Sequence, residues 1–336
     1  MCSFVLCCLV WTIDGIDIIH AANPPDCFFP LARLFKLFGK KFVFDEHDLC
    51  PELYDSKFGR QGSIYRALML FQRHSYAAAD LVISTNESYR QIAQERGRLS
   101  DSRVAVVRNA PPDSFCRTEP RLELKEGFPY LLVYLGVMGK QDGVDRVIRA
   151  AHHLIHEQGR RDVLFVLVGK GECWQALQNL SRELEVDKFV RFPGRISDDL
   201  LLDYLSTADV GLAPDPPDRM NQLSTMTKIV EYMACERPIV SFDLLESRRS
   251  AADAAVYVEK DDPQMFAAAI SDLLNDPARR DRMGRIGCER VEQFVGWRHS
   301  GKALLEAYSR LDGTLTPSLA SPVIRCSDKV SPPATY

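Results

Sequence analysis

The stretch STMTKIVEYMACERPIV, residues 224–240, places an amphipathic helical pattern directly before a short apolar strand. Ser224 and Thr225 are residue types that favour the N-cap of a helix, so we expect the helix to begin there. Lys228 and Glu231 lie three residues apart and therefore share one face of that helix. The start of a helix presents unpaired backbone N–H groups and the positive end of the helix dipole, which favour an anion. With Lys228 beside these groups and a carboxylate one turn further on, the layout fits a phosphate that carries a sugar.

Short apolar runs alternate with amphipathic stretches in both directions from this helix. The runs lack the period-two alternation of half-exposed strands, which indicates strands buried on both faces. Helical patterns separate most of them, and this order predicts parallel sheets in an α/β fold. The expected strands are 17–20, 41–47, 81–85, 104–109, 130–136, 163–169, 190–194, 210–214, 238–242 and 254–258.

The polar stretch CRTEPRLELKEGFP, residues 116–129, contains proline and has no clear period, so we interpret it as a linker between two sheets. The expected domains are an N-terminal Rossmann-like domain at 1–120 and a C-terminal Rossmann-like domain at 121–296. The tail at 312–336 is rich in Ser, Thr and Pro, and we expect it to be disordered.

The composition narrows the class of protein. The chain has 336 residues, of which 46% are hydrophobic and 26% charged, and this is typical of a globular protein of two ordinary domains. A formal net charge of -4 argues against a dedicated nucleic-acid-binding protein. The 10 cysteines form no C-x-x-C pair, which favours a reduced, cytoplasmic protein and argues against a zinc site.

The N-terminal segment MCSFVLCCLVWTIDG is apolar but too short to span a membrane, and it lacks the basic start and cleavage site of a signal peptide. We interpret it as a core segment of a chain that once began further upstream. About four strands are expected in the N-terminal domain, without the Gly-rich first turn of a doubly wound domain. The N-terminal domain is therefore expected to be incomplete.

Glycines follow several of the expected strands. In YLGVMGKQDGVD, Gly136 and Gly139 come between a strand and a helix, where glycine permits close approach of the backbone to a ligand, and Lys140 adds a charge. In FPGRIS, the backbone at Gly194 and Arg195 is suited to pairing with the edge of a nucleobase. A tight turn and a surface arginine would explain these residues equally well.

Four polar residues, DEHD at 45–48, stand at the end of the second expected strand. Such residues are costly to bury, so we expect them to face solvent or a cleft, with His47 as a candidate functional residue. The histidines of HHLIH at 152–156 fit a solvated helix face better than a metal site, and no metal is expected. The amphipathic stretch 27–41 fits a helix packed on its own sheet, with contact to an anionic membrane as the alternative.

These motifs together resemble the retaining GT-B glycosyltransferases of family 4. The resemblance runs from about residue 17 to about residue 311. It is carried by the signature STMTKIVEYMACERPIV and by other stretches in the same order, which include DIIHAANPPD, FVFDEHDLCPELY, AADLVISTNESYR, YLGVMGKQDGVD, FVLVGKGE, VRFPGRISDDLLLDYLSTADVGLAPDP and GWRHSGKALLEAYSRL. It implies two Rossmann-like domains that face a cleft, and a helix at 297–311 that returns to the N-terminal domain.

The resemblance also implies roles for the residues of the signature. Glu231 would hold the ribose hydroxyls of a nucleotide sugar. Lys228, with the backbone from Ser224 through Thr225 to Met226, would meet the diphosphate.

Other residues receive implied roles from the same resemblance. Gly136 and Gly139 would approach the phosphates, Gly194 and Arg195 would border the base, and His47 would lie near the transferred sugar.

The chain departs from the family pattern at three places. Leu223 stands where the usual Glu-x7-Glu pair would have its first glutamate. Val137 and Asp142 stand where the phosphate loop commonly has Arg and Lys. The first strand and its Gly-rich acceptor loop are not evident, which questions acceptor binding.

The activity implied is transfer of a sugar from a nucleotide diphosphate sugar, expected to be UDP-linked, to a glycan, lipid-linked or small-molecule acceptor, in polysaccharide or glycolipid assembly. No separate cofactor is implied. The expected location is cytoplasmic, with peripheral contact at the inner face of the plasma membrane. Two alternatives remain open: an inactive nucleotide-sugar-binding remnant, and a GT-B-fold sugar-nucleotide epimerase.

Overall fold

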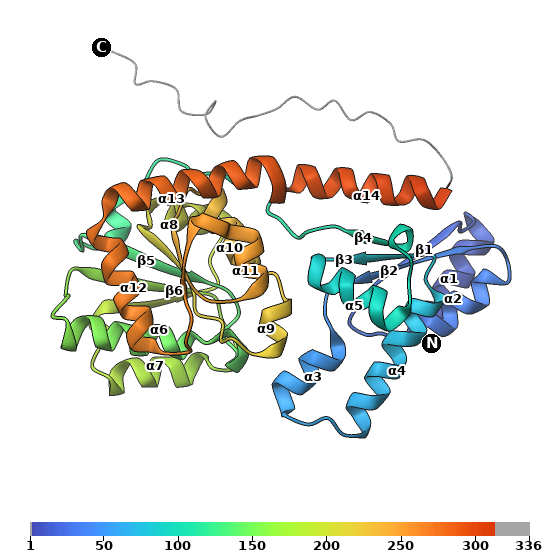
Figure 1. The fold of residues 1–336 in the computed structure, drawn as a ribbon, viewed down its shortest axis with the longest axis horizontal. Helices are drawn as coiled ribbons and strands as arrows, with labels where there is room; N and C mark the ends of the chain where they lie inside the picture. The colour runs from blue at the N-terminus through green and yellow to red at the C-terminus, as the bar shows by residue number, and fades with distance from the viewer. Residues whose placement is uncertain (1, 313–336) are drawn as a thin grey trace, which may run out of the picture. The chain divides into compact units, whose positions relative to one another are not determined.

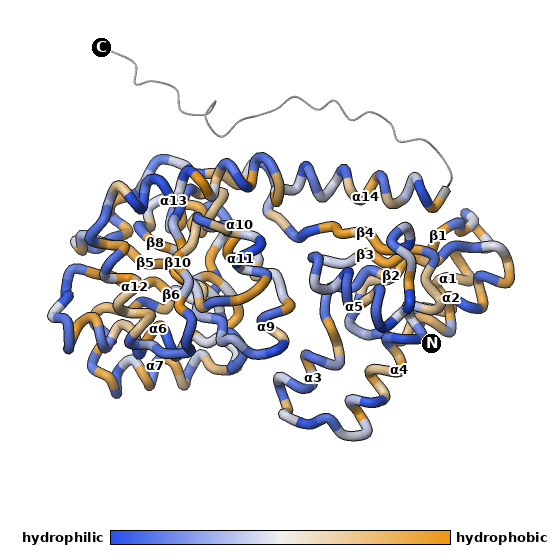
Figure 2. Tube along the Cα trace, viewed as in Figure 1, coloured by the Kyte–Doolittle hydropathy of each residue, from blue (hydrophilic) through white to orange (hydrophobic). Residues whose placement is uncertain are grey.

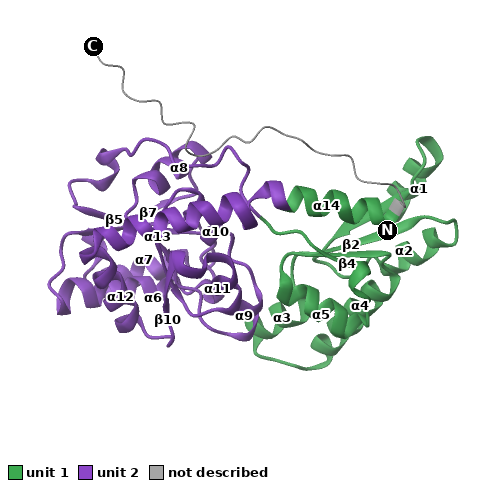
Figure 3. Cartoon of the chain, turned by 45° about the horizontal axis from the view of Figure 1, so that its top comes forward, with its two compact units in different colours: residues 1–109, 300–319 green, residues 110–299, 320–336 purple. Residues whose placement is uncertain are grey.

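The computed structural model of the chain describes residues 2–312 and divides them into two compact units (Figures 1 and 3). Unit 1 contains residues up to Asn109 and the described residues from Ser300 onward, and unit 2 contains Ala110–His299. Of the tail expected to be disordered, 312–336, Asp312 is described as the last residue of a helix, and residues 313–336 lie outside the described residues.

Unit 1 is built on a parallel sheet of 4 strands in the order β1-β2-β3-β4. Ile18 pairs with Lys41, Val43 with Leu81, and Val82 with Val104. The strands are β1 Ile18–Ala22, β2 Lys41–Glu46, β3 Leu81–Ser84 and β4 Val104–Val106. The helices are α1 Cys2–Ile13, α2 Phe29–Lys36, α3 Cys50–Phe58, α4 Ser63–Ala78 and α5 Glu87–Gly97.

Unit 2 is built on a parallel sheet of 6 strands in the order β10-β9-β8-β5-β6-β7. The chain order reverses at β5, between β8 and β6, and α/β sheets bind ligands at the carboxyl ends of strands beside such a reversal. The strands are β5 Tyr130–Leu135, β6 Val163–Val168, β7 Val190–Gly194, β8 Val210–Ala213, β9 Ile239–Phe242 and β10 Ala255–Val258. The helices are α6 Val144–His152, α7 Trp174–Glu183, α8 Asp198–Thr207, α9 Arg219–Leu223, α10 Thr227–Ala234, α11 Leu245–Ala251, α12 Pro263–Asn275 and α13 Pro277–Arg290. Short 3-10 and π turns connect these elements at Asp101–Arg103, Leu122–Lys125, Lys140–Asp142, His153–Glu157, Asp187–Phe189, Ala252–Ala254 and Val291–Val295.

The sheet of unit 2 is covered on both faces. Alternate residues of β5 point to opposite sides, so Leu132 and Tyr134 join a core with α6, α7 and α12, whereas Leu131 and Val133 join a core with α8 and α10. Figure 2 shows the strands coloured mostly as hydrophobic and the outer turns as hydrophilic. Burial on both faces explains why the strands are unbroken apolar runs. All ten expected strands are present, and the predicted α/β class with two Rossmann-like domains is confirmed.

The closing helix α14, Trp297–Asp312, contributes to unit 1. Ala307 is fully buried in a core cluster with Val43 and Ile83. The hydroxyl of Tyr308 lies 2.5 Å from Nδ1 of His20. Ala307 and Tyr308 therefore attach the later part of this helix to the sheet of unit 1.

The N-terminal segment differs from its prediction as a core segment. It forms helix α1, in which Phe4, Leu6 and Ile13 are exposed, while Trp11 packs against the ring of Phe35 at 5.5 Å between ring centroids. A helix that is apolar all round cannot bury every side against one neighbouring layer, so part of its surface stays in contact with solvent. Among residues 2–312, the longest apolar helices fall short of the length and hydropathy that crossing a membrane requires.

Candidate functional site

Three loops meet at the carboxyl ends of β5, β6 and β7. The N–H of Gly136 donates to the carbonyl of Val168 at 3.1 Å, and the N–H of Gly169 donates to that of Gly194 at 2.9 Å. A Cβ atom on Gly169 would lie 1.8 Å from the carbonyl oxygen of Gly136, which no side chain can accommodate. The glycines therefore allow neighbouring loops to pack backbone against backbone at the edge where ligands bind.

Gly136 brings the first of these loops next to the start of α10. Its φ is +149°, a backbone conformation that side chains rarely adopt. A Cβ atom there would lie 2.9 Å from Oη of Tyr134 and 3.4 Å from Cε of Lys228. The sequence-predicted residues Gly136 and Lys228 are therefore neighbours in the structure, although they lie 92 positions apart in the sequence.

Lys228 is a buried cation that pairs with Asp215 among the described residues. Only 7% of the residue is exposed, and its Nζ donates to Oδ1 of Asp215 at 2.6 Å and to Oδ2 at 2.8 Å. The ammonium also lies 5.2 Å from the ring centroid of Tyr134. A buried lysine needs a partner of opposite charge, and Asp215 supplies it from the loop after β8. Because an ammonium carries three N–H groups, one remains for a ligand.

Glu231 lies one turn beyond Lys228 on α10. Burial raises the pKa of its carboxyl group, the charge of Lys228 lowers it, and that of Asp198 raises it further. Within the part of the chain that the structure describes, no side chain or backbone N–H donates to this carboxylate. A partly desolvated carboxylate without a donor is suited to accept hydrogen bonds from ligand hydroxyls.

The start of this helix differs from its prediction. Ser224 and Thr225 do not occupy the N-cap: α9 ends at Leu223, Ser224 follows it and donates its hydroxyl to the carbonyl of Met220 at 2.9 Å, and α10 begins at Thr227. Met226 takes the N-cap position and makes no side-chain cap. The side chain of Met226 therefore does not compete with a ligand for the first amides of α10.

Gly139 and Lys140 belong to a tight turn. The N–H of Gly139 donates to Oδ2 of Asp142 at 2.8 Å, so the carboxylate at the family's usual lysine position closes the turn. Lys140 is exposed and lines a cavity of about 300 Å³ with Cys173 and Leu180, beside α6 and α7. Lys140 therefore borders the helical layer of unit 2.

Gly194 is buried with a φ of +81°, and Arg195 after it is exposed. A Cβ atom on Gly194 would lie 3.1 Å from Cε of Lys170. The ammonium of Lys170 lies 5.4 Å from the ring centroid of Trp174, an arrangement that stabilises the cation over the aromatic face. Sequence reasoning did not single out Lys170 and Trp174, which follow the expected strand at 163–169.

His47 belongs to unit 1, where it shares an aspartate with a second histidine. Oδ2 of Asp45 lies 3.1 Å from Nε2 of His47 and 3.0 Å from Nε2 of His20. Burial raises the pKa of Asp45, but hydrogen bonds from both histidines outweigh it and bring the pKa to about 2. The hydrogen bond to Asp45 in turn raises the pKa of His47. The side chain of His47 is 40% exposed and can reach a ligand.

A buried asparagine holds the loop of His47 in place. Oδ1 of Asn23 accepts from the backbone N–H of His47 at 2.7 Å and from that of Asp48 at 3.1 Å. Its Nδ2 donates to the carbonyl of Asp48 at 2.8 Å and to Oδ1 of Asp26 at 2.7 Å. Asn23 follows β1, and its carboxamide fixes the turn that follows β2.

Glu46 was predicted to face solvent or a cleft with its neighbours, and this prediction is wrong. Its side chain is fully buried, and Oε1 accepts from Oη of Tyr76 at 2.5 Å and from Nε2 of Gln72 at 3.0 Å. Burial raises the pKa of Glu46 to about 8. Successive side chains of a strand point to opposite faces, so Asp45 and Glu46 cannot both lie on the exposed side.

Among residues 2–312, His, Cys, Asp and Glu side chains form no group of three that could hold a metal ion. His153 of the histidine-rich segment instead pairs with Glu157 at 2.7 Å.

The two units match two family models. Residues 129–276 match the model for glycosyl transferases group 1, and residues 9–112 match the model for glycosyltransferase family 4. Between them, the two matches cover most of both units.

Relatives and solved structures agree with these matches. The chain is 28% identical over 267 residues to the D-inositol 3-phosphate glycosyltransferase of Thermomonospora curvata, covering 73% of this chain and 60% of that protein. It is 29% identical over 258 residues to the same enzyme of Kineococcus radiotolerans, covering 70% and 58%. The chain thus spans about 60% of the length of the first of these relatives.

The fold is also that of solved structures. Sucrose-phosphate synthase from Thermosynechococcus elongatus aligns with a TM-score of 0.77 at 17% identity, covering 93% of this chain and 77% of that one. HepE of Anabaena in complex with UDP aligns with a TM-score of 0.70 at 18% identity, covering 90% and 80%. The two parallel-sheet units and the two family matches together identify the chain as a member of the group 1 glycosyltransferases of family 4.

Proposed function

We propose that the protein transfers a sugar from a nucleoside diphosphate sugar to a hydroxyl acceptor with retention of the anomeric configuration. The observation that carries the proposal is the arrangement of Lys228 and Glu231 on one face of α10, with the backbone of Gly136 beside Lys228. The cation and the helix-start amides match the diphosphate of a nucleotide sugar. The carboxylate, which accepts no hydrogen bond from the described residues, matches the hydroxyls of its ribose.

The diphosphate is assigned to Lys228 and the start of α10. Lys228 keeps one N–H group beyond the two that Asp215 accepts, and the uncapped amides of α10 supply further donors. Because Asp215 compensates the charge of Lys228 in the absence of ligand, the site is held ready without an unpaired buried cation.

The ribose is assigned to Glu231. Two hydroxyls can donate to one carboxylate, and a hydrogen bond to a charged group contributes about 1.5–3 kcal/mol. HepE of Anabaena has been solved with UDP and with UDP-glucose, which supports a UDP-linked donor for a protein of the same fold.

In the reaction, the bond between the anomeric carbon and the diphosphate oxygen breaks, and its electron pair leaves with the diphosphate. The acceptor oxygen forms the new bond on the same face of the sugar and gives its proton to the departing phosphate oxygen. Lys228 and the helix-start amides stabilise the charge that develops on the leaving group, and this lowers the barrier. No separate cofactor enters the proposal.

His47 is assigned to the transferred sugar. Its hydrogen bond to Asp45 fixes the ring, and Asn23 fixes its backbone. Participation in polysaccharide or glycolipid assembly, a cytoplasmic location and peripheral membrane contact stay predictions.

The test is turnover of UDP-sugars by the purified chain, followed by mass spectrometry with and without an added lysate-derived glycan or lipid acceptor pool. Transfer that requires the acceptor pool and is lost in Glu231→Ala but kept in Glu183→Ala supports the proposal. Glu183 is an exposed glutamate at the end of α7 and serves as the control.

Two other outcomes would contradict the proposal. Isomerisation or hydrolysis of the donor without an acceptor would identify a sugar-nucleotide epimerase. UDP binding without any turnover, across UDP- and GDP-sugars, would identify a binding protein.

A further inference from the structure

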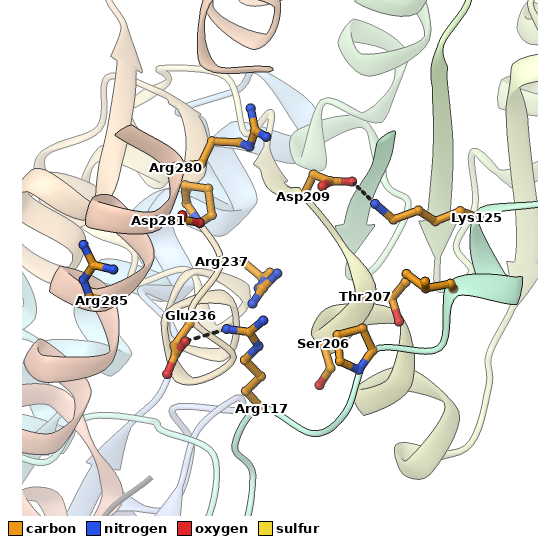
Figure 4. A pocket seen from close by; sticks show the side chains of 13 residues that line it. Arg117, Lys125, Ser206, Thr207, Asp209, Glu236, Arg237, Arg280, Asp281 and Arg285 are labelled. Carbon is orange, nitrogen blue, oxygen red and sulfur yellow. Dashed lines mark hydrogen bonds and ion pairs between the residues drawn. The ribbon is translucent and has the colours of Figure 1, made fainter. Parts of the chain in front are cut away.

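Unit 2 contains a second cavity at the amino ends of its central strands (Figure 4). The cavity has a volume of about 600 Å³, and Arg117, Arg237, Arg280 and Arg285 line it. Lys125 precedes β5, Asp209 precedes β8 and Pro238 precedes β9, so the cavity lies at the opposite end of these strands from Gly136 and Asp215. At about 3.3 Å per residue, strands of 4 to 6 residues put roughly 13–20 Å between the two ends.

The lining carries more positive than negative charge. Lys125 pairs with Asp209 at 2.8 Å, and Arg117 pairs with Glu236 at 2.8 Å. Figure 4 draws both pairs as dashed lines. The charges of these four groups compensate one another, so the net charge of the cavity depends mainly on the three remaining arginines.

Those three arginines have no carboxylate partner within the described residues. Arg237 donates to the carbonyls of Cys235 at 2.8 Å and Ala208 at 2.6 Å, and Arg280 donates to the carbonyl of Leu273 at 2.9 Å. Arg285 is exposed, and no described residue forms an ion pair or hydrogen bond with it.

Asp281 is the remaining carboxylate of the described lining. The described lining therefore holds five cationic side chains against three carboxylates.

Arg237 experiences this excess most strongly. Figure 4 shows its guanidinium in the middle of the cavity, between Arg117 and Arg280. Burial, with the charge of Arg117 as a smaller cause, lowers the pKa of Arg237 to about 10, although Cys235, Glu236 and Asp209 act in the opposite direction. An anion bound in the cavity would raise the pKa of Arg237 again, because it would place a negative charge beside a buried cation.

The lining also restricts the chemistry of the ligand. It combines charged side chains and hydroxyls with prolines and one leucine, and its described residues include no aromatic ring on which a nucleobase could stack. Arginine recognises phosphate oxygens through paired N–H groups. A compact phosphorylated anion fits this lining, and a nucleotide does not.

We propose that this cavity binds a small phosphorylated anion, of the class of pyrophosphate or a sugar phosphate, at a site separate from the nucleotide site. One wall of the cavity is the segment that leads into β5. Its Thr118 N–H donates to Oγ of Ser206 at 2.9 Å, and its Arg121 N–H donates to Oγ1 of Thr207 at 2.8 Å. An anion that bridges Arg117 and Arg285 would join this segment to α13, and it would therefore stabilise unit 2 against unfolding.

The test is calorimetric titration of the full chain with inorganic pyrophosphate while UDP saturates the nucleotide site. Glucose 1-phosphate and inorganic phosphate are titrated in parallel and separate the sugar-phosphate source from the free-anion source. We expect one binding event for pyrophosphate or glucose 1-phosphate that weakens as NaCl is raised.

The variant that tests the site is Arg285→Gln, with Arg282→Gln as its control. Both arginines are exposed on α13, but Arg285 lines the cavity and Arg282 does not, so neither variant is expected to perturb folding. Arg285→Gln should weaken the anion about 10-fold and leave UDP unchanged, because it removes one charged hydrogen bond.

Three results would overturn the proposal. The first is loss of all pyrophosphate and glucose 1-phosphate binding when UDP is present, and the second is equal affinity of Arg285→Gln and Arg282→Gln for the anion. The third is no binding of any of the three anions at millimolar concentration. If the wild-type chain does not bind UDP, the proposed function is contradicted. The same anion titrations, carried out without UDP, would then test this site.

Discussion

Glu46→Gln should change how the stability of unit 1 depends on pH. Glu46 is fully buried, with Tyr76 and Gln72 donating to it from α4. The nearby charges are those of Asp26, which raises its pKa, and Arg96 on α5, which lowers it. Glutamine has the same shape and can still accept from both donors, but it has no proton to lose.

The magnitude follows from the pKa. Burial raises the pKa of Glu46 from 4.5 to about 8. Between these values the folded protein keeps a proton that the unfolded chain releases, so the free energy of unfolding falls by about 1.4 kcal/mol per pH unit. The stabilisation is complete below pH 4.5, and about 5 kcal/mol of it is lost once the pH passes 8.

The assay is urea unfolding from pH 5 to pH 9, followed by the fluorescence of Trp11, with Trp174 and Trp297 replaced by Phe. Trp11 is partly buried against the core of unit 1 and therefore reports its unfolding. His47, whose raised pKa also makes stability fall with rising pH, contributes equally to wild type and variant and cancels in their difference.

Glu95→Gln is the matched control, since Glu95 is an exposed glutamate of the same unit. We expect the control to have the same free energy of unfolding as the wild type at every pH. The free energy of unfolding of Glu46→Gln should rise relative to both as the pH increases to 8. A difference between wild type and Glu46→Gln that does not change with pH would refute the assignment of a proton to Glu46.

Three further predictions concern the loops and the two candidate sites. Asp215→Ala should lower the free energy of unfolding of unit 2 by about 3–5 kcal/mol in urea titrations, because it leaves Lys228 buried without a partner; an unchanged value would contradict the buried pair. Asp45→Asn should lower the pKa of His47, measured by NMR of its ring protons, and an unchanged pKa would show that Asp45 does not set it. Gly169→Ala should weaken UDP binding at least tenfold with the sheet intact by circular dichroism, since its Cβ would force the neighbouring loop away; wild-type affinity would show that the loops move freely.

The strands could be predicted from the sequence because burial on both faces leaves an unbroken apolar run. VLFVLVG at 163–169 is such a run, and every residue of β6 is buried. Lys228 and Glu231 could be predicted as a pair because helical spacing alone puts them on one face.

The start of α10 could not be predicted as easily, because a five-residue helix precedes it. Asp218 caps that helix by accepting from the N–H of Asn221 at 2.7 Å, and Ser224 is used at its end. So short a helix has no periodic pattern to detect, and the hydroxyl residues were assigned to the wrong helix.

The partners of buried charges were harder still. Asp215 lies in a proline-rich loop 13 positions before Lys228, where spacing says nothing about contact. The burial of Glu46 had a signal, since strand alternation separates it from Asp45, but Tyr76 and Gln72 come from a distant helix that only the fold brings near.

The measurement that tests the central claim most directly is calorimetric titration with UDP and with uridine, using wild type, Glu231→Ala, Lys228→Gln and the control Glu183→Ala. If α10 holds a nucleoside diphosphate, Glu231→Ala should weaken both ligands by about 10- to 150-fold, the scale of hydrogen bonds to a charged group. Lys228→Gln should weaken UDP and leave uridine nearly unchanged, because Lys228 meets only the diphosphate. Wild-type affinity of Glu231→Ala for both ligands, or an equal loss of UDP and uridine in Lys228→Gln, would contradict the claim.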